Sequence, residues 1–542
     1  CAHDGGYSTF RVHISELLEK DNRLTVEVDN SINDRIYPQK ADFTFYGGIY
    51  RDVSLMVVPK DHIALGHFGD TGVKITPALK DGKADIRVET LVEGEGVLSV
   101  ELLDAAGNIV ATAEGADAKL HLETPHLWDG VKDPYLYTCV VRLSRDGRVV
   151  DEVSTRVGLR TFSVDAKNGF FLNGRPYPLH GVSRHQDRKG IGNALTKEMH
   201  KEDMDLIREI GANTIRLAHY QHDQYFYDLC DEYGMLVWND FWISTEGSNL
   251  NVNDEDLFIE NARQTVKRFR NHPSIAVWCP RNEGYATPTM APRLERLIAG
   301  EDGTRFYSPN SRYMNLRTSG PWHYIDEKEY FAVQACGFTT ELGSPSVPTA
   351  ESMRKFIPES ERWPISDTWY YHDLHFGLPE YCQAVDDLYG KAESLDDFCR
   401  KAQLINYDSH RAMLEAWNSR MWNSASGVLL WMSHPAWPSL EWQTYSWDFE
   451  THGSFYGCRK ACEKLHVQAN PHDGQVLVVN TTRNDCRRAR VVVSRYTFDG
   501  KRLDGLSENV AVIAANGVTP VTVLQPLPGD PHYDQEKGIE YV

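Results

Sequence analysis

The sequence lacks any apolar run that approaches the roughly 20 residues needed to span a bilayer. Its basic residues are outnumbered, because 57 Lys and Arg stand against 77 Asp and Glu and leave a formal net charge of −20. Phosphate groups are bound by basic stripes, so this charge argues against nucleic acids and anionic membranes as partners. No charged and apolar leader precedes Cys1, so no signal peptide is visible, and a bacterial-type soluble protein of the periplasm or cytoplasm is expected.

The motifs of several hydrolase classes are also missing. The ten cysteines form no repeating pair, and Cys458 and Cys462 have no second pair nearby, which argues against a zinc site. We therefore expect buried free thiols. The chain contains neither a Gly-x-Ser-x-Gly elbow nor a His-Glu-x-x-His helix, which sets aside serine-hydrolase and zinc-hydrolase chemistry.

The length of 542 residues exceeds what a single core normally supports, so three or four domains are predicted. Residues 1–58 contain four short strand-like runs and predict part of an antiparallel sandwich. Residues 59–163 repeat the pattern, and an immunoglobulin-like sandwich is the economical interpretation. Residues 466–542 return to short strands and predict a further, partial sandwich.

The expected strands of these three regions alternate with turn residues. In the first region they are Tyr7–Val12, Leu24–Val28, Phe43–Tyr46 and Val53–Val58. In the second they are Asp85–Val92, Val97–Leu103, Lys119–Leu122, Leu136–Leu143 and Val149–Val157. In the last they are Val476–Asn480, Ala489–Thr497 and Val521–Leu524.

Between these sandwiches, residues 164–465 change to a helical period. Amphipathic helices alternate with short buried strands, and this alternation predicts parallel β/α units. The helices are expected at Leu195–Gly211, Gln224–Glu232, Asp254–Phe269 and Ser454–Leu465. The strands are expected at Thr214–Leu217, Met235–Trp238, Ser274–Trp278, Ala332–Thr340 and Val428–Trp431. About 300 residues suit an eight-fold (β/α) TIM barrel, flanked here by the β-sandwich domains.

Polar side chains follow the predicted barrel strands, at the ends where barrel enzymes place catalytic groups. In chain order they are His180, Arg184, His185, Asp187, Arg216, His219, Asn239, Asp240, Arg281, Asn282, Glu283, Glu341, Trp431 and His434. Two glutamates among such residues suit glycoside hydrolysis, which needs a carboxylic acid to protonate the leaving oxygen and a carboxylate to attack the sugar carbon or activate water. Each residue alone also has a structural explanation: Arg216 can pair with Asp240, and the histidines and Trp431 can belong to the core.

Two stretches at these strand ends resemble motifs of glycoside hydrolase family 2. The stretch Arg270–Glu283 is similar to the acid/base motif of that family, with Cys279 where Gly or Ser is usual. The stretch Asn213–Tyr220 is similar to the second motif, but Leu217 replaces a small residue and Gln221 replaces the proline that usually follows.

Further stretches point to different branches of the family. His180–Asp187 resembles the β-galactosidase branch, whereas Glu341–Pro348 and Pro435–Ser439 resemble the branch of exo-glucosaminidases and β-mannosidases. The resemblance covers nearly the whole chain and implies a sugar-binding jelly roll, an immunoglobulin-like domain, the catalytic barrel and further sandwiches. It also implies that the jelly roll and the last domain are incomplete in this chain.

Carried over residue by residue, the resemblance makes Glu283 the general acid/base and Glu341 the nucleophile. Asn282 would bind the hydroxyl beside the reacting carbon, and Arg216 would hold the nucleophile. Leu342 replaces the aromatic residue that usually follows the nucleophile, so Glu351 and Glu415 are the alternatives; both lie in predicted helices instead of at a strand end. The other candidate substrate-binding residues are His219, Asp240, His185, Arg281, Trp431 and His434.

The favoured function is a retaining exo-acting β-glycosidase that removes terminal β-galactosides from oligosaccharides or polysaccharide-derived glycosides. A β-glucuronidase or β-galacturonidase is the alternative, because Arg281, His185 and His434 would gather basic groups near the mouth and a guanidinium suits a carboxylate-bearing sugar. β-Mannosidase, exo-glucosaminidase and a catalytically lapsed carbohydrate-binding protein stay open. No cofactor or metal is required; a non-catalytic Mg or Na cation and a homo-oligomeric state are compatible with the sequence but not demanded by it.

Overall fold

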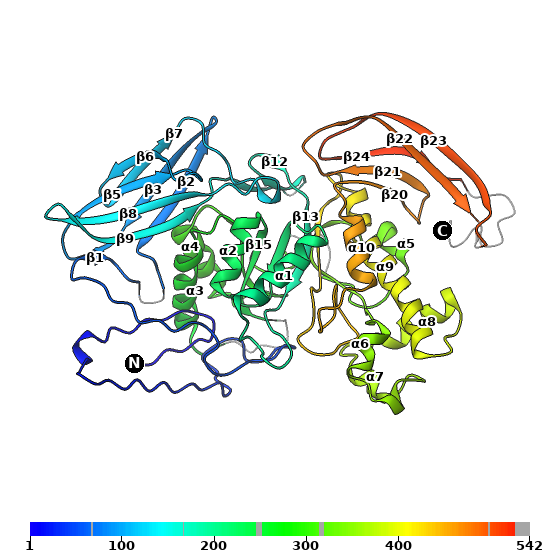
Figure 1. The fold of residues 1–542 in the computed structure, drawn as a ribbon, viewed down its shortest axis with the longest axis horizontal. Coiled ribbons are helices and arrows are strands. Elements are labelled where there is room, and N and C mark those ends of the chain that lie inside the picture. The colour runs from blue at the N-terminus through cyan, green and yellow to red at the C-terminus, as the bar shows by residue number, and fades with distance from the viewer. Residues whose placement is uncertain (67–68, 166, 245–251, 314–318, 497–498, 526–542) are drawn as a thin grey trace.

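The computed structural model describes residues 1–542 except for 67–68, 166, 245–251, 314–318, 497–498 and 526–542. Figure 1 shows an elongated molecule in which a β-sandwich, a central barrel and a second sandwich follow one another, while the N-terminal segment lies below the first two. Within the described part of the chain, no helix combines the length and the hydropathy required to cross a bilayer. All ten cysteines are free, as predicted, and five of them are buried.

The N-terminal segment, residues 1–61, differs from the prediction, because its described residues contain only the 3-10 turn η1 (Ser15–Leu17) and no strand. The alternating apolar side chains of the second and fourth predicted strands face solvent: Leu24 is 77% exposed and Val57 is 87% exposed. A strand needs a hydrogen-bonded neighbour and a cover for its apolar face, and these runs have neither among the described residues. Other parts of the segment pack on the barrel, where Tyr7 stacks on Tyr220 with ring centroids 4.8 Å apart.

The first sandwich packs the sheet β2-β3-β7 against the sheet β6-β5-β8-β9, with a small β1-β4 ladder at its edge. Its strands are β1 His62–Ile63, β2 Val73–Lys80, β3 Lys83–Thr90, β4 Val92–Glu93, β5 Val97–Leu103, β6 Ile109–Glu114, β7 Asp117–Leu122, β8 Tyr137–Arg145 and β9 Arg148–Val157. The prediction missed β2 and β6. The first contains Pro77, a residue that is uncommon within strands, and the second carries small residues after Ile109, which is 54% exposed.

The central sheet confirms the TIM-barrel prediction. Its described strands run parallel in the order β17-β16-β15-β14-β13-β19-β18. They are β13 Leu179–Arg184, β14 Thr214–Leu217, β15 Leu236–Ile243, β16 Ile275–Arg281, β17 Phe306–Tyr307, β18 Gly337–Leu342 and β19 Ala425–Leu430. On the open side of β18, the Gly320 N–H donates to the carbonyl of Glu341 over 3.0 Å, so the chain beside Gly320 extends the ring toward β17.

Helices cover the outside of the barrel, and a small antiparallel sheet, β10 Phe162–Asp165, β11 Gly169–Leu172 and β12 Arg175–Pro176, precedes it. Helix α1 begins after Thr196, whose hydroxyl accepts from the Met199 N–H, and α2 ends at Gly234, which adopts a positive φ of 76°. The helices are α1 Lys197–Glu209, α2 Gln224–Tyr233, α3 Glu255–Phe269, α4 Ala291–Glu301, α5 Glu327–Glu329, α6 Ala350–Arg354, α7 Asp367–Tyr371, α8 Leu378–Tyr389, α9 Leu395–Ser419 and α10 Gly453–Ala461, with 3-10 turns η2 Gly130–Lys132 and η4 Glu359–Glu361.

Two predicted elements of the barrel region are shorter than expected. The predicted strand Ala332–Thr340 begins instead at Gly337, because Tyr330–Gln334 forms a π-helix that buries Tyr330 and Phe331. The predicted helix Ser454–Leu465 ends at Ala461, and Leu465 already belongs to the next sheet. Short apolar runs fit both a helix and a strand, so periodicity did not separate them.

The C-terminal sandwich consists of the described sheets β20-β21-β24 and β22-β23. Its strands are β20 Leu465–Ala469, β21 Gln475–Asn480, β22 Cys486–Tyr496, β23 Arg502–Ile513 and β24 Gly517–Val523. The prediction missed β23, whose polar residues and Gly505 interrupt the apolar alternation. Thr497, the last residue of one predicted strand, lies outside the described residues.

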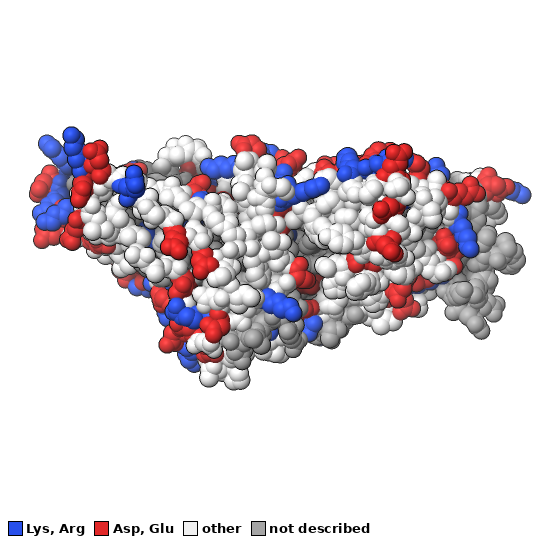
Figure 2. Space-filling model, turned by 90° about the horizontal axis from the view of Figure 1, so that it is seen from below, with Lys and Arg blue, Asp and Glu red and all other residues white. Residues whose placement is uncertain are grey.

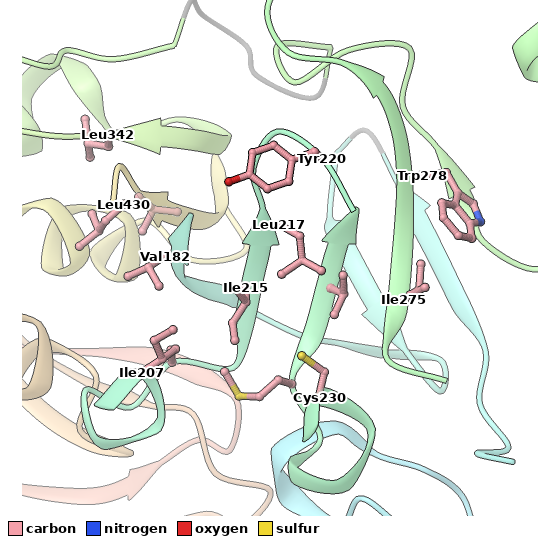
Figure 3. Close-up of a cluster of buried hydrophobic side chains, with 14 of the residues drawn as sticks. Val182, Ile207, Ile215, Leu217, Tyr220, Cys230, Ile275, Trp278, Leu342 and Leu430 are labelled. Atoms are coloured by element: carbon pink, nitrogen blue, oxygen red, sulfur yellow. The ribbon is translucent and has the colours of Figure 1, made fainter. Parts of the chain in front are cut away.

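The barrel core fixes the direction of the side chains that matter for the site. Ile215 and Leu217 of β14 belong to one buried hydrophobic cluster with Ile207 of α1 and Cys230 of α2, part of which Figure 3 shows. Because side chains alternate along a strand, Arg216 between them points into the barrel. Viewed from below, the molecule carries intermixed basic and acidic residues at both ends and a mostly uncharged surface between them (Figure 2).

Candidate active site

Arg216 stands at the centre of the polar network inside the barrel. Its Nη2 and Nε atoms donate to Asp240 Oδ2 over 2.7 and 3.0 Å, and its Nη1 donates to Glu341 Oε1. Arg216 and Asp240 are completely buried, and Glu341 is 4% exposed. A buried charge is stable only when paired, so this guanidinium ties the ends of β14, β15 and β18 together.

Asn282 joins the same network from the end of β16. Its Oδ1 accepts from Arg216 Nη2 over 2.6 Å and from the hydroxyl of Ser311 over 2.9 Å. Two donors on one amide oxygen fix the plane of the side chain, so Asn282 presents its amide in one orientation beside Glu341.

Glu283 follows directly, in a backbone conformation that non-glycine residues rarely adopt. Its φ is +39°, which costs about 1 kcal/mol or more, and its N–H donates to Ser311 Oγ over 2.9 Å. Arg312 Nη2 donates to Glu283 Oε1 over 3.1 Å. Such strain persists where the surrounding structure holds a residue in place, and it is found at active sites more often than elsewhere.

The two glutamates act on each other electrostatically. Burial raises the pKa of Glu283 above its ordinary value, and the nearby charge of Glu341 raises it further; Arg312 opposes both effects. Glu283 directly follows β16 and Glu341 lies at the end of β18, so both belong to the carboxyl-end face of the barrel. One of them is favoured in its protonated form while the other is paired with Arg216, which is the division that an acid and a nucleophile require.

An aromatic wall borders the carboxyl groups. His219 Nδ1 bonds to Asp240 Oδ2 over 3.0 Å, and the His219 ring stacks on Trp431 with centroids 5.0 Å apart. His185 meets Trp431 edge-on at 5.5 Å, and burial lowers the pKa of His185 well below its ordinary value. The structure thus brings His185, His219 and Trp431 together with Glu283 and Glu341.

His434 and Arg281, which were predicted to bind substrate, are instead hydrogen-bonded to backbone carbonyls of the chain. His434 is 1% exposed, donates from Nε2 to the carbonyl of Asp187 over 3.3 Å and stacks on Tyr445. Burial lowers the pKa of His434 to about 4, so it is a neutral ring behind the wall, and the prediction that it adds a basic group at the mouth is wrong. Arg281 is buried and donates from Nε to the carbonyl of Glu283 over 3.3 Å, which ties it to the backbone of the acid.

Sequence reasoning missed several residues of the site. Ser311 and Arg312 follow β17, which has only two residues and gives no periodic signal. Phe43 packs on His185 and His219, with centroids 5.0 and 6.0 Å apart, from a segment predicted to belong to a separate sandwich. Burial lowers the pKa of His375, and the charge of the neighbouring Asp42 partly opposes this effect, so the N-terminal segment also comes near the loop that carries His375.

The residues at which this chain departs from the family motifs do not displace any of the polar and aromatic side chains described above. Leu217 and Leu342 are completely buried in the outer core, where their side chains pack among those of the helices. Cys279 is also buried, and Gln221 donates to the carbonyl of Asp240 over 2.8 Å. These substitutions lie behind the acidic pair and leave its partners in place.

A second polar cluster lies at the amino end of β16, where Asp228, Asp231 and His272 bring one potential metal-ligand atom each within 4.8 Å of one another. His272 Nδ1 bonds to Asp231 Oδ2 over 2.6 Å, and Arg156 pairs with Asp228 over 3.0 Å. Because these groups already satisfy one another, the cluster is explained as a structural network.

Two family models and several known proteins are similar to this chain. A family model described as "Glycosyl hydrolases family 2, TIM barrel domain" matches residues 163–415, and one described as "Glycosyl hydrolases family 2" matches residues 67–160. A β-glucuronidase of Bacteroides fragilis is 35% identical over 331 residues, which cover 56% of this chain and 48% of that protein. A β-galactosidase of Halalkalibacterium halodurans is 31% identical over 380 residues, which cover 66% of this chain and 35% of that protein.

Among solved structures, the exo-chitosanase of Amycolatopsis orientalis matches with a TM-score of 0.73 and 20% identity, over 84% of this chain and 60% of that one. At this identity the likeness concerns the fold alone. The chain spans about half the length, or less, of the curated relatives described here.

Proposed function

We propose that this chain, which belongs to glycoside hydrolase family 2, is the catalytic part of a retaining exo-acting β-glycosidase. The observation that carries the proposal is the pair Glu283 and Glu341: one is a buried carboxyl whose pKa is raised, and the other is bound to Arg216. Asn282, His219 and Trp431 surround the pair and provide hydrogen bonds and an apolar surface for a sugar ring.

The reaction would proceed in two displacements. The Glu341 carboxylate attacks the anomeric carbon while Glu283 donates its proton to the glycosidic oxygen, so the leaving group departs as an alcohol and a glycosyl ester forms on Glu341. Glu283, now ionised, takes a proton from water, and the resulting hydroxide equivalent attacks the anomeric carbon and releases Glu341. This mechanism needs the two carboxyl groups roughly 5–5.5 Å apart.

For the terminal sugar we propose a β-glucuronide. The relative with the higher identity of the two described above is a β-glucuronidase. Arg312, whose side chain is 32% exposed, places a guanidinium beside Glu283, and a guanidinium suits a sugar carboxylate. A β-galactoside is the second candidate, because His180–Asp187 resembles the β-galactosidase branch and a β-galactosidase is among the relatives.

Two measurements test the proposal. In a panel of p-nitrophenyl glycosides, kcat/KM should be highest for the β-glucuronide; faster turnover of the β-galactoside would favour the second candidate instead. Proton NMR during early turnover should show a first-formed product with the β configuration of the substrate. An α-configured first product would refute the double displacement for either sugar.

A further inference from the structure

The loop between α7 and α8, residues 372–377, has an exposed aromatic residue that folding does not explain. Phe376 is 78% exposed and adopts a positive φ of 58°. A phenyl ring that stays exposed contributes no hydrophobic free energy to folding. A left-handed backbone conformation is unfavourable for a residue with a β-carbon. Two unfavourable features at one position indicate that the ring is held outward for another purpose.

The loop is continuous with the candidate active site. The ring of His375 packs on Trp442 with centroids 4.3 Å apart. Trp442 belongs to the same apolar cluster as Trp431, which stacks on His219 in the site, and Gly343, two residues after Glu341, lies against Trp442. A path of contacts therefore leads from the strand end of Glu341 outward to His375, and Phe376 is the next residue along the chain.

The loop is also held firmly in this position. The His375 N–H donates to Glu441 Oε2 over 3.1 Å, and the N–H groups of Gly377 and Leu378 donate to the two carboxylate oxygens of Asp373 over 3.1 and 3.0 Å. Burial raises the pKa of Glu441 to about 9, and the neighbouring Asp373 carboxyl contributes to the rise. Glu441 therefore keeps a proton near neutral pH, and the pair fixes the loop without repulsion.

We propose that His375 and Phe376 form a subsite for the leaving group, and that its ligand is the second sugar ring of a β-linked oligosaccharide. This inference rests on the proposed function, because it places the ring that departs when Glu283 protonates the glycosidic oxygen. The Phe376 ring offers an apolar face for the C–H groups of a pyranose, and His375 offers a ring nitrogen to its hydroxyls.

The test compares two substrates that share the terminal sugar identified by the panel: a β-linked disaccharide and the corresponding β-glycosyl fluoride, whose leaving group is a single atom. The ratio of their kcat/KM values isolates contacts made by the second ring. Phe376→Gly should lower this ratio about tenfold or more. Because glycine adopts a positive φ without strain, this variant should melt no lower than the parent protein, so the loss does not come from unfolding.

Two further variants complete the design. Phe376→Tyr keeps the ring face and should keep the ratio within about threefold of the parent value. Tyr456→Ala removes an aromatic residue of α10 that is 47% exposed and lies outside the proposed subsite; it should leave the ratio unchanged. An unchanged ratio in Phe376→Gly, or an equal fall in Tyr456→Ala, would overturn the proposal.

A binding measurement separates this inference from the proposed function. In a Glu341→Gln background, calorimetric titration with the disaccharide should show a Kd at least about fivefold weaker when Phe376→Gly is added. If the parent protein turns over neither substrate, the proposed function fails, and the same titration with a disaccharide that ends in β-glucuronic acid, the terminal sugar proposed above, still decides the subsite. Equal Kd values with and without Phe376→Gly would refute it.

Discussion

Similar Asp–His pairs lie near the two ends of β16, and their surroundings differ. At its amino end His272 pairs with Asp231 over 2.6 Å, and at the level of its carboxyl end His219 pairs with Asp240 over 3.0 Å. The Asp231 Oδ1 atom accepts from the N–H of Ser274 over 3.1 Å, so the chain itself completes the first network. The second network shares Arg216 between two acids.

The two ends also differ in how many energetically unfavourable features they contain. The amino end satisfies its charges with neighbouring groups, and such a network stabilises the fold. The carboxyl end holds Glu283 with a positive φ and a raised pKa, and it gathers three buried carboxyl groups, of which Asp240 and Glu341 share the Arg216 guanidinium. An Asp–His pair alone therefore does not indicate a functional site. The pair indicates one where it lies at the carboxyl end of a parallel barrel, next to an acidic residue with a strained backbone.

The largest expected effect comes from removing the charge of Glu341. Glu341→Gln should lower kcat by about a thousandfold or more, because an amide does not form the glycosyl ester, while the melting temperature stays close to that of the parent. Glu351→Gln is the matched control, since Glu351 lies on the exposed face of α6. Steady-state kinetics should find this control within about twofold of the parent protein; the reverse order would place the nucleophile elsewhere.

The comparison of the two ends is sharpened by truncating their histidines one at a time. His219→Ala should lower kcat/KM about 10- to 100-fold, because it removes a ring from the wall of the site. His272→Ala should lower the free energy of unfolding by about 1–3 kcal/mol, since Asp231 loses its partner in a buried position.

The decisive readout is kcat for the folded fraction of His272→Ala, with folding followed by chemical denaturation. It should stay within about twofold of the parent value. A loss of kcat as large as that of His219→Ala would erase the distinction between the two ends.

A smaller effect is expected when Arg312 is replaced. Arg312 lowers the pKa of Glu283, so Arg312→Gln should let it rise. Because Glu283 must be protonated to act as the acid, the alkaline limb of the pH profile of kcat/KM should move to higher pH, by up to about one unit. Movement to lower pH, or a shift of the acidic limb alone, would contradict the role given to Glu283.

Much of the barrel was predictable from the sequence, and the roles given to Glu283 and Glu341 stay predictions. The strand Thr214–Leu217 was predicted with its observed bounds, and the polar residues after it and after β16 meet as expected. This succeeded because buried parallel strands are continuous apolar runs whose ends converge at one face of the barrel.

The remainder depended on tertiary contacts that periodicity does not encode. Strand β17 is too short to detect, so Ser311 and Arg312 were missed. The alternation in residues 1–58 suggested strands, but alternation predicts a strand only where a neighbouring strand is present to pair with it. His434 was predicted to lie at the mouth of the barrel because it follows β19. In the structure its ring instead bonds to the carbonyl of Asp187.

The most direct test of the account is covalent capture of the nucleophile. A 2-deoxy-2-fluoro β-glycoside with an activated leaving group and the preferred terminal sugar should inactivate the protein with a stoichiometry of one. Mass spectrometry of the digested protein should then place the sugar on Glu341. A label on Glu283, Glu351 or Glu415, or full turnover without any trapped ester, would contradict the arrangement in which Glu341 attacks and Glu283 supplies the proton.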